Sequence, residues 1–137
     1  MQIFRSTDIP VRPADPATFV GPAHMQPLAS SDAGTPVHVY RVQFEAGGRT
    51  NWHTHSGAQW LFVVEGRIRV QVEGGPVQDV EAGDAIVIAP NEKHWHGAVP
   101  GSGGVHLAVN VHATTTWLEP VADDDYDPMY AGESGAS

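Results

Sequence analysis

The sequence of 137 residues contains no cysteine. This absence excludes disulfide bonds, zinc sites built from thiolates and a cysteine nucleophile. The chain also has no stretch that approaches the roughly 18 apolar residues that a membrane-spanning helix needs. Its N-terminal segment, MQIFRSTDIPVRP, has no apolar run that would indicate a secretory signal peptide. We therefore expect a cytoplasmic protein.

Basic residues are scarce as well. Seven Lys and Arg stand against sixteen Asp and Glu, which gives a formal net charge of −9. Proteins that bind nucleic acid need a basic surface, so this charge argues against such a partner. Part of the acidity lies in the run from Asp123 to Asp127, which we expect to be a solvated, weakly helical tail.

Glycine and proline, by contrast, recur at short intervals, and the runs between them are rich in Val and Ile. This pattern is typical of many short strands joined by turns, and it predicts an all-β antiparallel sandwich or barrel. A chain of this length has room for one hydrophobic core. We therefore expect a single domain over residues 1–130 and a disordered tail over residues 131–137.

The positions of the strands follow from the same pattern. We expect a loop at 29–36, one or two helical turns within 117–126, and strands at 19–28, 37–45, 60–66, 67–72, 76–80, 85–89 and 105–112. Gly66 should end the strand 60–66. This strand and the strand 85–89 are apolar on both faces, so each should be covered on both sides by a second sheet or by a partner chain. A homodimer would supply the partner.

The stretch GGRTNWHTHSGAQWLFVVEG, residues 47–66, carries the chemistry. In an extended strand, side chains two residues apart point to the same face, so His53, His55 and Gln59 should point the same way. Gly57 lies between them and should leave room for a ligand. His94 comes from a second strand after a Pro90-Asn91 turn. Three imidazoles and one amide oxygen from two strands predict a half-open site for a divalent metal.

Two further histidines are candidates for acid–base chemistry. His96 lies two residues after His94 and therefore on the same face, where it could support the ligands or act as an alternative base. His106 shares its strand face with Ala108 and Asn110, a small and a polar residue that suit the wall of a pocket. A histidine that only bonds to a neighbouring strand would fit this position equally well.

At this point the residues resemble a known family. Gly47, His53, His55 and Gly66 match the first motif of the cupins, G-x5-H-x-H-x3-E-x6-G, and Gln59 stands where the motif has Glu. Gly83, Pro90 and His94 match the second cupin motif, with the proline one residue late and Asn91 where glycine is common. The resemblance implies a small single-domain cupin barrel with one metal site.

The replacement of Glu by Gln59 matters chemically. Three neutral imidazoles and a neutral amide would leave a divalent ion with its full +2 charge, whereas a carboxylate would reduce it to +1. Such an ion should polarise a bound oxygen more strongly and favour anionic ligands. The change also removes the carboxylate that some cupin dioxygenases are thought to use as a base.

Within the cupins, the patterns WHTH-x3-Q, EKHWHGA and GVHLAVN resemble the small manganese-dependent hydroxynitrile lyases of bacteria. This resemblance implies His106 as acid or base beside a small-molecule substrate. It also implies two sets of site residues: His53, His55, Gln59 and His94 as metal ligands, and Tyr40, Val42, Thr50 and Asn110 as the lining of the substrate pocket.

Three functions remain open from the sequence. The first is a lyase that cleaves a cyanohydrin into aldehyde and cyanide, with manganese as the metal. The second is a quercetinase-like dioxygenase that uses Fe, Ni or Mn. The third is a non-catalytic module that binds a metal or a small molecule. Mixed nitrogen and oxygen ligation accommodates Mn, Fe, Co, Ni or Zn, so the ligand set does not select the metal.

Overall fold

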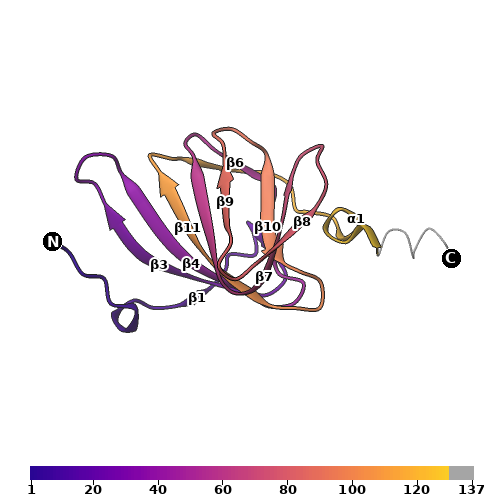
Figure 1. Cartoon of the computed structure of the whole chain (residues 1–137), viewed down its shortest axis with the longest axis horizontal. Coiled ribbons are helices and arrows are strands. Elements are labelled where there is room, and N and C mark those ends of the chain that lie inside the picture. The colour runs from indigo at the N-terminus through magenta and orange to yellow at the C-terminus, as the bar shows by residue number, and fades with distance from the viewer. Residues whose placement is uncertain (130–137) are drawn as a thin grey trace.

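The computed structural model describes residues 1–129, in which the regular structure is almost entirely β (Figure 1). The strands are β1 Arg12–Pro13, β2 Phe19–Val20, β3 Ala23–Ser31, β4 Val37–Phe44, β5 Arg49–Thr50, β6 His53–His55, β7 Gln59–Val72, β8 Gln78–Glu81, β9 Ala85–Ile88, β10 His94–Ala98, β11 Gly104–Val111 and β12 Thr115–Trp117. Two short helices are η1 Ser6–Asp8 and α1 Asp123–Tyr126. Within the described part of the chain, no helix is long and apolar enough to cross a membrane. The tail predicted at 131–137 lies outside the described residues.

All strand pairs are antiparallel, and the sheet curls into a half-barrel, as Figure 1 shows. The strands follow the order β1-β3-β4-β11-β7-β10-β5-β2, with β6, β8, β9 and β12 attached beside this path. The predicted all-β antiparallel fold is therefore confirmed. Successive side chains of each strand point to opposite faces, so one face of the curled sheet is buried in the interior.

Strand β7 is the longest element and belongs to both halves of the curled sheet. Its first half pairs with β11 and β9, and its second half pairs with β10 and β8. Gly66 lies at the change of partner with φ +61°, and an added Cβ would lie 2.3 Å from the carbonyl oxygen of Gly103. The prediction that Gly66 ends the strand was wrong, because glycine here allows the strand to bend and continue.

Other predicted boundaries also shifted. The predicted strand 37–45 is confirmed by β4, but the strand predicted at 19–28 is divided at Gly21-Pro22 into β2 and β3. Strand β3 then continues through the first part of the predicted loop, because its last residues pair with the start of β4. The one or two helical turns predicted within 117–126 correspond to α1 at Asp123–Tyr126, and β12 occupies 115–117 at the start of this range.

The interior is filled by side chains from the inward faces of the strands. Phe44, Leu61 and Ile68 are almost completely buried there. A separate cluster lies beneath the C-terminal segment, where Trp52 and Trp95 pack with Val121 and Tyr126. The second cluster matters for the site, because it holds the C-terminal segment against the strands that carry the histidines.

The acidic run is part of this packing. Tyr126 of α1 is buried, and the guanidinium of the buried Arg49 lies 4.3 Å from the centre of its ring. Arg49 also donates to the carbonyl oxygen of Val121 at 2.6 Å and to the carboxylate of Asp123 at 2.9 Å. Residues 123–125 are exposed and helical, as predicted, but the run is not a free tail, because the buried Tyr126 and the bond from Arg49 anchor it.

The outer face of β7 was expected to be covered, but the described chain leaves it open. Trp60, Phe62 and Val64 point outward and are 42%, 40% and 42% exposed, while Leu61 and Val63 between them are buried. Val87 of β9 pairs with Trp60 across the sheet and is 55% exposed. No second sheet of residues 1–129 lies over this apolar row, so the expected cover by a partner chain stays a prediction.

We propose that a second copy of the chain covers this row. The double substitution Trp60→Lys and Phe62→Lys should then shift the protein from a dimer to the 14.6-kDa monomer, because a lysine pair cannot be buried without compensation. Size-exclusion chromatography with light scattering measures the mass. Val11→Lys, at an exposed apolar residue near the N-terminus, is the control. A wild-type protein that is already monomeric would contradict the proposal.

Candidate metal centre

The site is built by the pairing of two short strands. In β6, His53 and His55 alternate with Thr54 and are both buried. Strand β10 runs antiparallel to β6, and its first residue, His94, lies directly opposite His53. Directly opposed residues of an antiparallel pair have neighbouring Cβ atoms, which explains why the ring centres of these two histidines are 4.2 Å apart. The ring of His55 lies 4.9 Å from that of His53 and 5.3 Å from that of His94.

Main-chain carbonyl groups determine which ring nitrogen carries the proton. Nδ1 of His53 lies 2.8 Å from the carbonyl oxygen of Asn51, and Nδ1 of His94 lies 2.8 Å from that of Glu92. A carbonyl oxygen can only accept, so both Nδ1 atoms must donate. The lone pair of each neutral ring therefore lies on Nε2, which is the arrangement that a metal ligand needs.

Gln59 presents an oxygen to the same place. Its amide NH₂ donates to Oδ1 of Asn110 at 2.8 Å, which turns Oε1 towards the histidines. Oε1 lies 3.3 Å from Nε2 of His94. Neither of these two atoms carries a hydrogen, so two lone pairs face each other. A cation between them would turn this repulsive contact into an attractive one.

Gly57 contributes in a different way from the one expected. Residues 56–58 form the turn between β6 and β7, so His53 and Gln59 do not lie on one continuous strand. A Cβ atom at Gly57 would lie 2.3 Å from the carbonyl oxygen of Val111. The expectation that Gly57 leaves room for a ligand was wrong. It allows two backbones to approach closely, and this contact places Gln59 beside the histidines.

His96 and His106 form a hydrogen-bonded pair next to this group. Nε2 of His106 and Nδ1 of His96 are 2.8 Å apart, and both side chains are buried. Nε2 of His96 has no hydrogen-bond partner among the described residues. The rings of His96 and His94 stack with centres 5.6 Å apart, which agrees with their predicted position on one face. His53, His94 and His96 each offer a ligand atom within 4.8 Å of the other two.

Burial keeps these imidazoles neutral. It lowers the pKa of His53 well below its usual value, and the neighbouring His94 lowers this pKa further. Burial, followed by His94, lowers the pKa of His55 to about 4. Burial also lowers the pKa of His94, and it lowers that of His106 to about 3. Burial and then His106 lower the pKa of His96 well below its usual value. Neutral rings retain the lone pairs that bind a cation.

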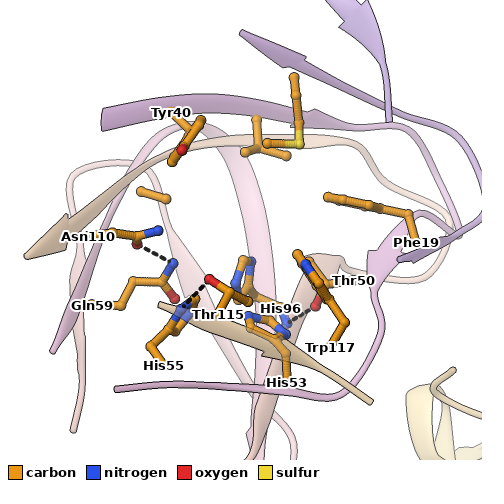
Figure 2. A pocket seen from close by; sticks show the side chains of 13 residues that line it. Phe19, Tyr40, Thr50, His53, His55, Gln59, His96, Asn110, Thr115 and Trp117 are labelled. Atoms are coloured by element: carbon orange, nitrogen blue, oxygen red, sulfur yellow. Dashed lines mark hydrogen bonds between the residues drawn. The ribbon is translucent and has the colours of Figure 1, made fainter. Parts of the chain in front are cut away.

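A cavity of about 210 Å³ opens onto the histidines. In Figure 2 the imidazoles of His53, His55 and His96 lie at one end of this cavity, and Tyr40 lies at the opposite end. The residues lining it are Phe19, Met25, Tyr40, Val42, Thr50, His53, His55, Gln59, His96, Ala108, Asn110, Thr115 and Trp117. All four residues expected to line a substrate pocket, Tyr40, Val42, Thr50 and Asn110, are in this wall.

The two acid–base candidates take different places. His96 is part of the cavity wall, whereas His106 is not among the lining residues and contacts Phe44 and His96 instead. The expectation of His106 beside a substrate therefore differs from its position in the structure. His106 is buried on β11 and bonds to His96 of β10, which itself lines the cavity.

Sequence reasoning missed part of this wall. Thr115 and Trp117 come from β12, which pairs with β6 so that Thr115 lies opposite His55 and Trp117 opposite His53. Nδ1 of His55 lies 2.9 Å from Oγ1 of Thr115, and the ring of Trp117 lies 4.6 Å from that of His53. The β-branched and aromatic residues of the sequence TTTW could have indicated a strand here. Phe19 and Met25 carried no comparable signal.

A divalent cation fits the residues that converge here. The Nε2 atoms of His55 and His96 are buried without a hydrogen-bond partner among the described residues. Nε2 of His53 and of His94 carry lone pairs, and Oε1 of Gln59 faces the same group. Nitrogen and neutral oxygen donors of this kind suit a divalent transition metal. The cluster of His53, His94 and His96 is therefore able to bind a metal ion. The chemistry of these ligands does not identify the metal.

Comparison with known proteins shows which family this chain resembles in sequence. Residues 40–111 match the family model described as the cupin domain. A curated protein from Granulicella tundricola, named (R)-mandelonitrile lyase, is 39% identical over 117 residues, which cover 83% of this chain and 88% of that protein.

Solved structures agree on the fold. A cupin-like protein from Thermotoga maritima superposes with a TM-score of 0.81 at 33% identity, over 85% of this chain and 90% of that one. The polyketide cyclase RemF from Streptomyces resistomycificus superposes with a TM-score of 0.67 at 18% identity, over 95% of this chain and 93% of that one.

The close approach at Gly57 yields the first prediction for the site. Gly57→Ala should lower the melting temperature by at least about 3 °C, because the new methyl group must push β11 and the turn apart. Gly75→Ala is the matched control, since its Cβ would meet its nearest neighbour, the carbonyl oxygen of Val72, at 3.3 Å. Differential scanning calorimetry measures both variants. Equal melting temperatures would contradict the packing role of Gly57.

The depressed pKa values of the buried histidines predict how stability depends on pH. In the unfolded chain these histidines have a pKa of about 6.5 and take up protons below it. In the folded protein burial lowers the pKa of these histidines, to about 4 for His55 and to about 3 for His106. Acidification from pH 7.5 to 5 should therefore favour the unfolded state and lower the melting temperature of the metal-free protein. His106→Asn should show a shallower decline, because one buried site no longer titrates. A flat profile over this range would contradict the prediction.

Proposed function

The chain belongs to the cupin family, and on that premise we propose that it is a metal-dependent lyase of the hydroxynitrile-lyase type. The observation that carries the proposal is the pair of facing lone pairs on Gln59 and His94, within a buried group of neutral imidazoles. The relative named (R)-mandelonitrile lyase supports the reaction class. The proposed substrate is a cyanohydrin, which is cleaved into an aldehyde and cyanide.

We assign the metal-binding role to His53, His55, Gln59 and His94, with manganese as the proposed ion. The orientation of Gln59 favours this set, because its Oε1 lies 3.3 Å from Nε2 of His94. His96 is the competing ligand, since its Nε2 lies near those of His53 and His94. We assign His96 to proton transfer instead, because its Nδ1 lies 2.8 Å from Nε2 of His106, an imidazole nitrogen that can exchange a proton with it. The Nδ1 atoms of His53 and His94 face carbonyl oxygens, which can only accept. A bound divalent ion would supply a Lewis acid that polarises a substrate oxygen.

The neutral ligand set favours a lyase over a dioxygenase. Gln59 cannot act as the carboxylate base that a quercetinase-like reaction is thought to use. It would also leave the charge of a bound divalent ion undiminished, and such an ion would favour anionic species. The base must then be another residue, and His96 is the imidazole outside the proposed ligand set that lines the cavity.

The His96–His106 pair is suited to carry one proton. Nε2 of His96 accepts the hydroxyl proton of the cyanohydrin, and the carbon–carbon bond breaks with its electron pair leaving on cyanide. The same nitrogen then returns the proton to cyanide. Burial lowers the pKa of His96, so its protonated form is favoured only while an anion lies beside it. Nε2 of His106 lies 2.8 Å from Nδ1 of His96 and holds the ring in place.

The apolar part of the cavity wall suits the rest of the substrate. Phe19, Met25 and Trp117 provide apolar and aromatic surface, and they exclude water from the histidines. Asn110 is committed to Gln59 through its Oδ1, so its amide NH₂ is left to face the cavity. We propose that the apolar residues bind the side chain of an aromatic or aliphatic cyanohydrin.

The test is turnover of mandelonitrile by manganese-loaded protein. Release of benzaldehyde, followed by its ultraviolet absorbance, should depend on the metal and should fall by at least about 100-fold in His96→Ala, because a general base contributes about 10² to 10⁴. His53→Ala should lose both bound manganese and turnover. His24→Ala, at a histidine of β3 outside the site, is the matched control.

Three outcomes would contradict the proposal. Benzaldehyde release that is unchanged by removing the metal would exclude a metal-dependent lyase. Consumption of oxygen with a flavonol or a diketone, without cleavage of mandelonitrile, would instead favour the dioxygenase. Metal binding without turnover of either substrate class would favour the non-catalytic module.

A further inference from the structure

One histidine of the group is held differently from the others. His53 and His94 donate to main-chain carbonyl groups, which cannot donate in return. Nδ1 of His55 faces the hydroxyl of Thr115 instead, at 2.9 Å. A hydroxyl can either accept from a ring nitrogen or donate to it. The position of the proton on His55 therefore depends on a single side chain.

The two possible arrangements have opposite consequences for Nε2 of His55. When Thr115 accepts, Nδ1 keeps the proton and Nε2 presents a lone pair to the group. When Thr115 donates, the proton moves to Nε2, which can no longer bind a cation. Nε2 of His55 is buried and has no hydrogen-bond partner among the described residues, so a proton there would be unsatisfied. This cost favours the arrangement in which Thr115 accepts.

The backbone around Thr115 fixes the hydroxyl in this position. Strands β12 and β6 pair with Thr115 opposite His55. The turn just before β12 is tied to the turn after β6 by two further bonds: the main-chain N–H of Ser56 donates to the carbonyl oxygen of Thr114 at 3.0 Å, and that of Thr114 donates to Oγ of Ser56 at 2.8 Å. The branched Cβ of threonine restricts its rotamers, so the hydroxyl stays directed at the ring.

The C-terminal segment holds this strand from its other end. The main-chain N–H of Leu118 donates to the carbonyl oxygen of Trp52 at 2.8 Å, and that of Trp52 donates to the carbonyl oxygen of Glu119 at 2.9 Å. Residues 115–119 are thus joined to the strand that carries His53 and His55 by hydrogen bonds on both sides of Thr115. The hydroxyl is presented by a rigid element rather than by a free loop.

We propose that Thr115 is a positioning residue, which orients His55 and fixes its tautomer so that Nε2 binds the cation. The proposal rests on the proposed function in one respect, namely that His55 rather than His96 completes the ligand set. It assigns a role to a residue from the end of the chain, outside both histidine motifs.

The test compares three variants. Thr115→Val keeps the shape of the side chain but removes the hydroxyl, and Thr115→Ser keeps the hydroxyl. Thr116→Val makes the same change at the neighbouring exposed residue, which points away from His55. Titration with Mn²⁺, monitored by electron paramagnetic resonance of the free ion, gives the dissociation constant for each. Thermal unfolding of the metal-free proteins shows whether each variant is folded.

We expect Thr115→Val to bind Mn²⁺ about 10- to 100-fold more weakly than the wild type, as for other groups that support a ligand. Thr115→Ser should regain most of this affinity, and Thr116→Val should match the wild type. Equal affinity of Thr115→Val and wild type would overturn the proposal. This result is the one expected if His53, His94 and His96 bind the metal without His55. The proposal also fails if Thr115→Ser binds as weakly as Thr115→Val, because the hydroxyl would then be irrelevant.

A second measurement needs no metal and separates this proposal from the proposed function. The ¹⁵N chemical shifts of the histidine rings report their tautomers. His55 should carry its proton on Nδ1 in the wild type and lose this preference in Thr115→Val. If the wild type binds no metal but the tautomer shifts, the proposed function fails and the positioning role stands. If the tautomer of His55 is the same in both proteins, the positioning role is refuted.

Discussion

The site depends on the burial of neutral imidazoles whose lone pairs are directed at one another. In His53 and His94 the same local hydrogen bond orients the lone pair, because each ring donates from Nδ1 to the carbonyl oxygen two residues earlier in the chain. This hydrogen bond needs no second side chain, so a short extended segment can supply an oriented ligand by itself. Its cost is a group of unpaired nitrogen atoms in an apolar interior, which only a cation can compensate fully.

The remaining parts of the site come from distant segments. Gln59 is aligned by Asn110 of β11, and His55 by Thr115 of β12. Trp117 covers one side of His53. The packing of Tyr126 against Arg49, together with the bond from Arg49 to the carbonyl oxygen of Val121, keeps the end of the chain in place. The histidines of the site therefore come from two short segments, 53–55 and 94–96. The side chains that support them lie more than 50 positions away from the residues they contact.

This division explains how much could be predicted from the sequence. The spacing of His53 and His55 identified a pair on one strand, and the alternating runs identified an all-β fold, because both patterns reflect the two-residue period of a strand. Gly57 was misinterpreted, since its role is set by the carbonyl oxygen of Val111, more than 50 residues later. The part played by β12 was missed for the same reason. Its three residues become a strand only by pairing with β6.

Strand β7 has a further consequence. Its side chains alternate between the two faces of the sheet, so Gln59 faces the histidines while the adjacent Trp60 faces outward beside Val87. A slip of one residue in its pairing would bury the indole and expose the amide. The ligand-bearing interior and the apolar exterior are thus encoded in the same register. Insertions or deletions in the turn at residues 56–58 should therefore be selected against, because they would disturb the histidine site on the inner face and the apolar row on the outer face.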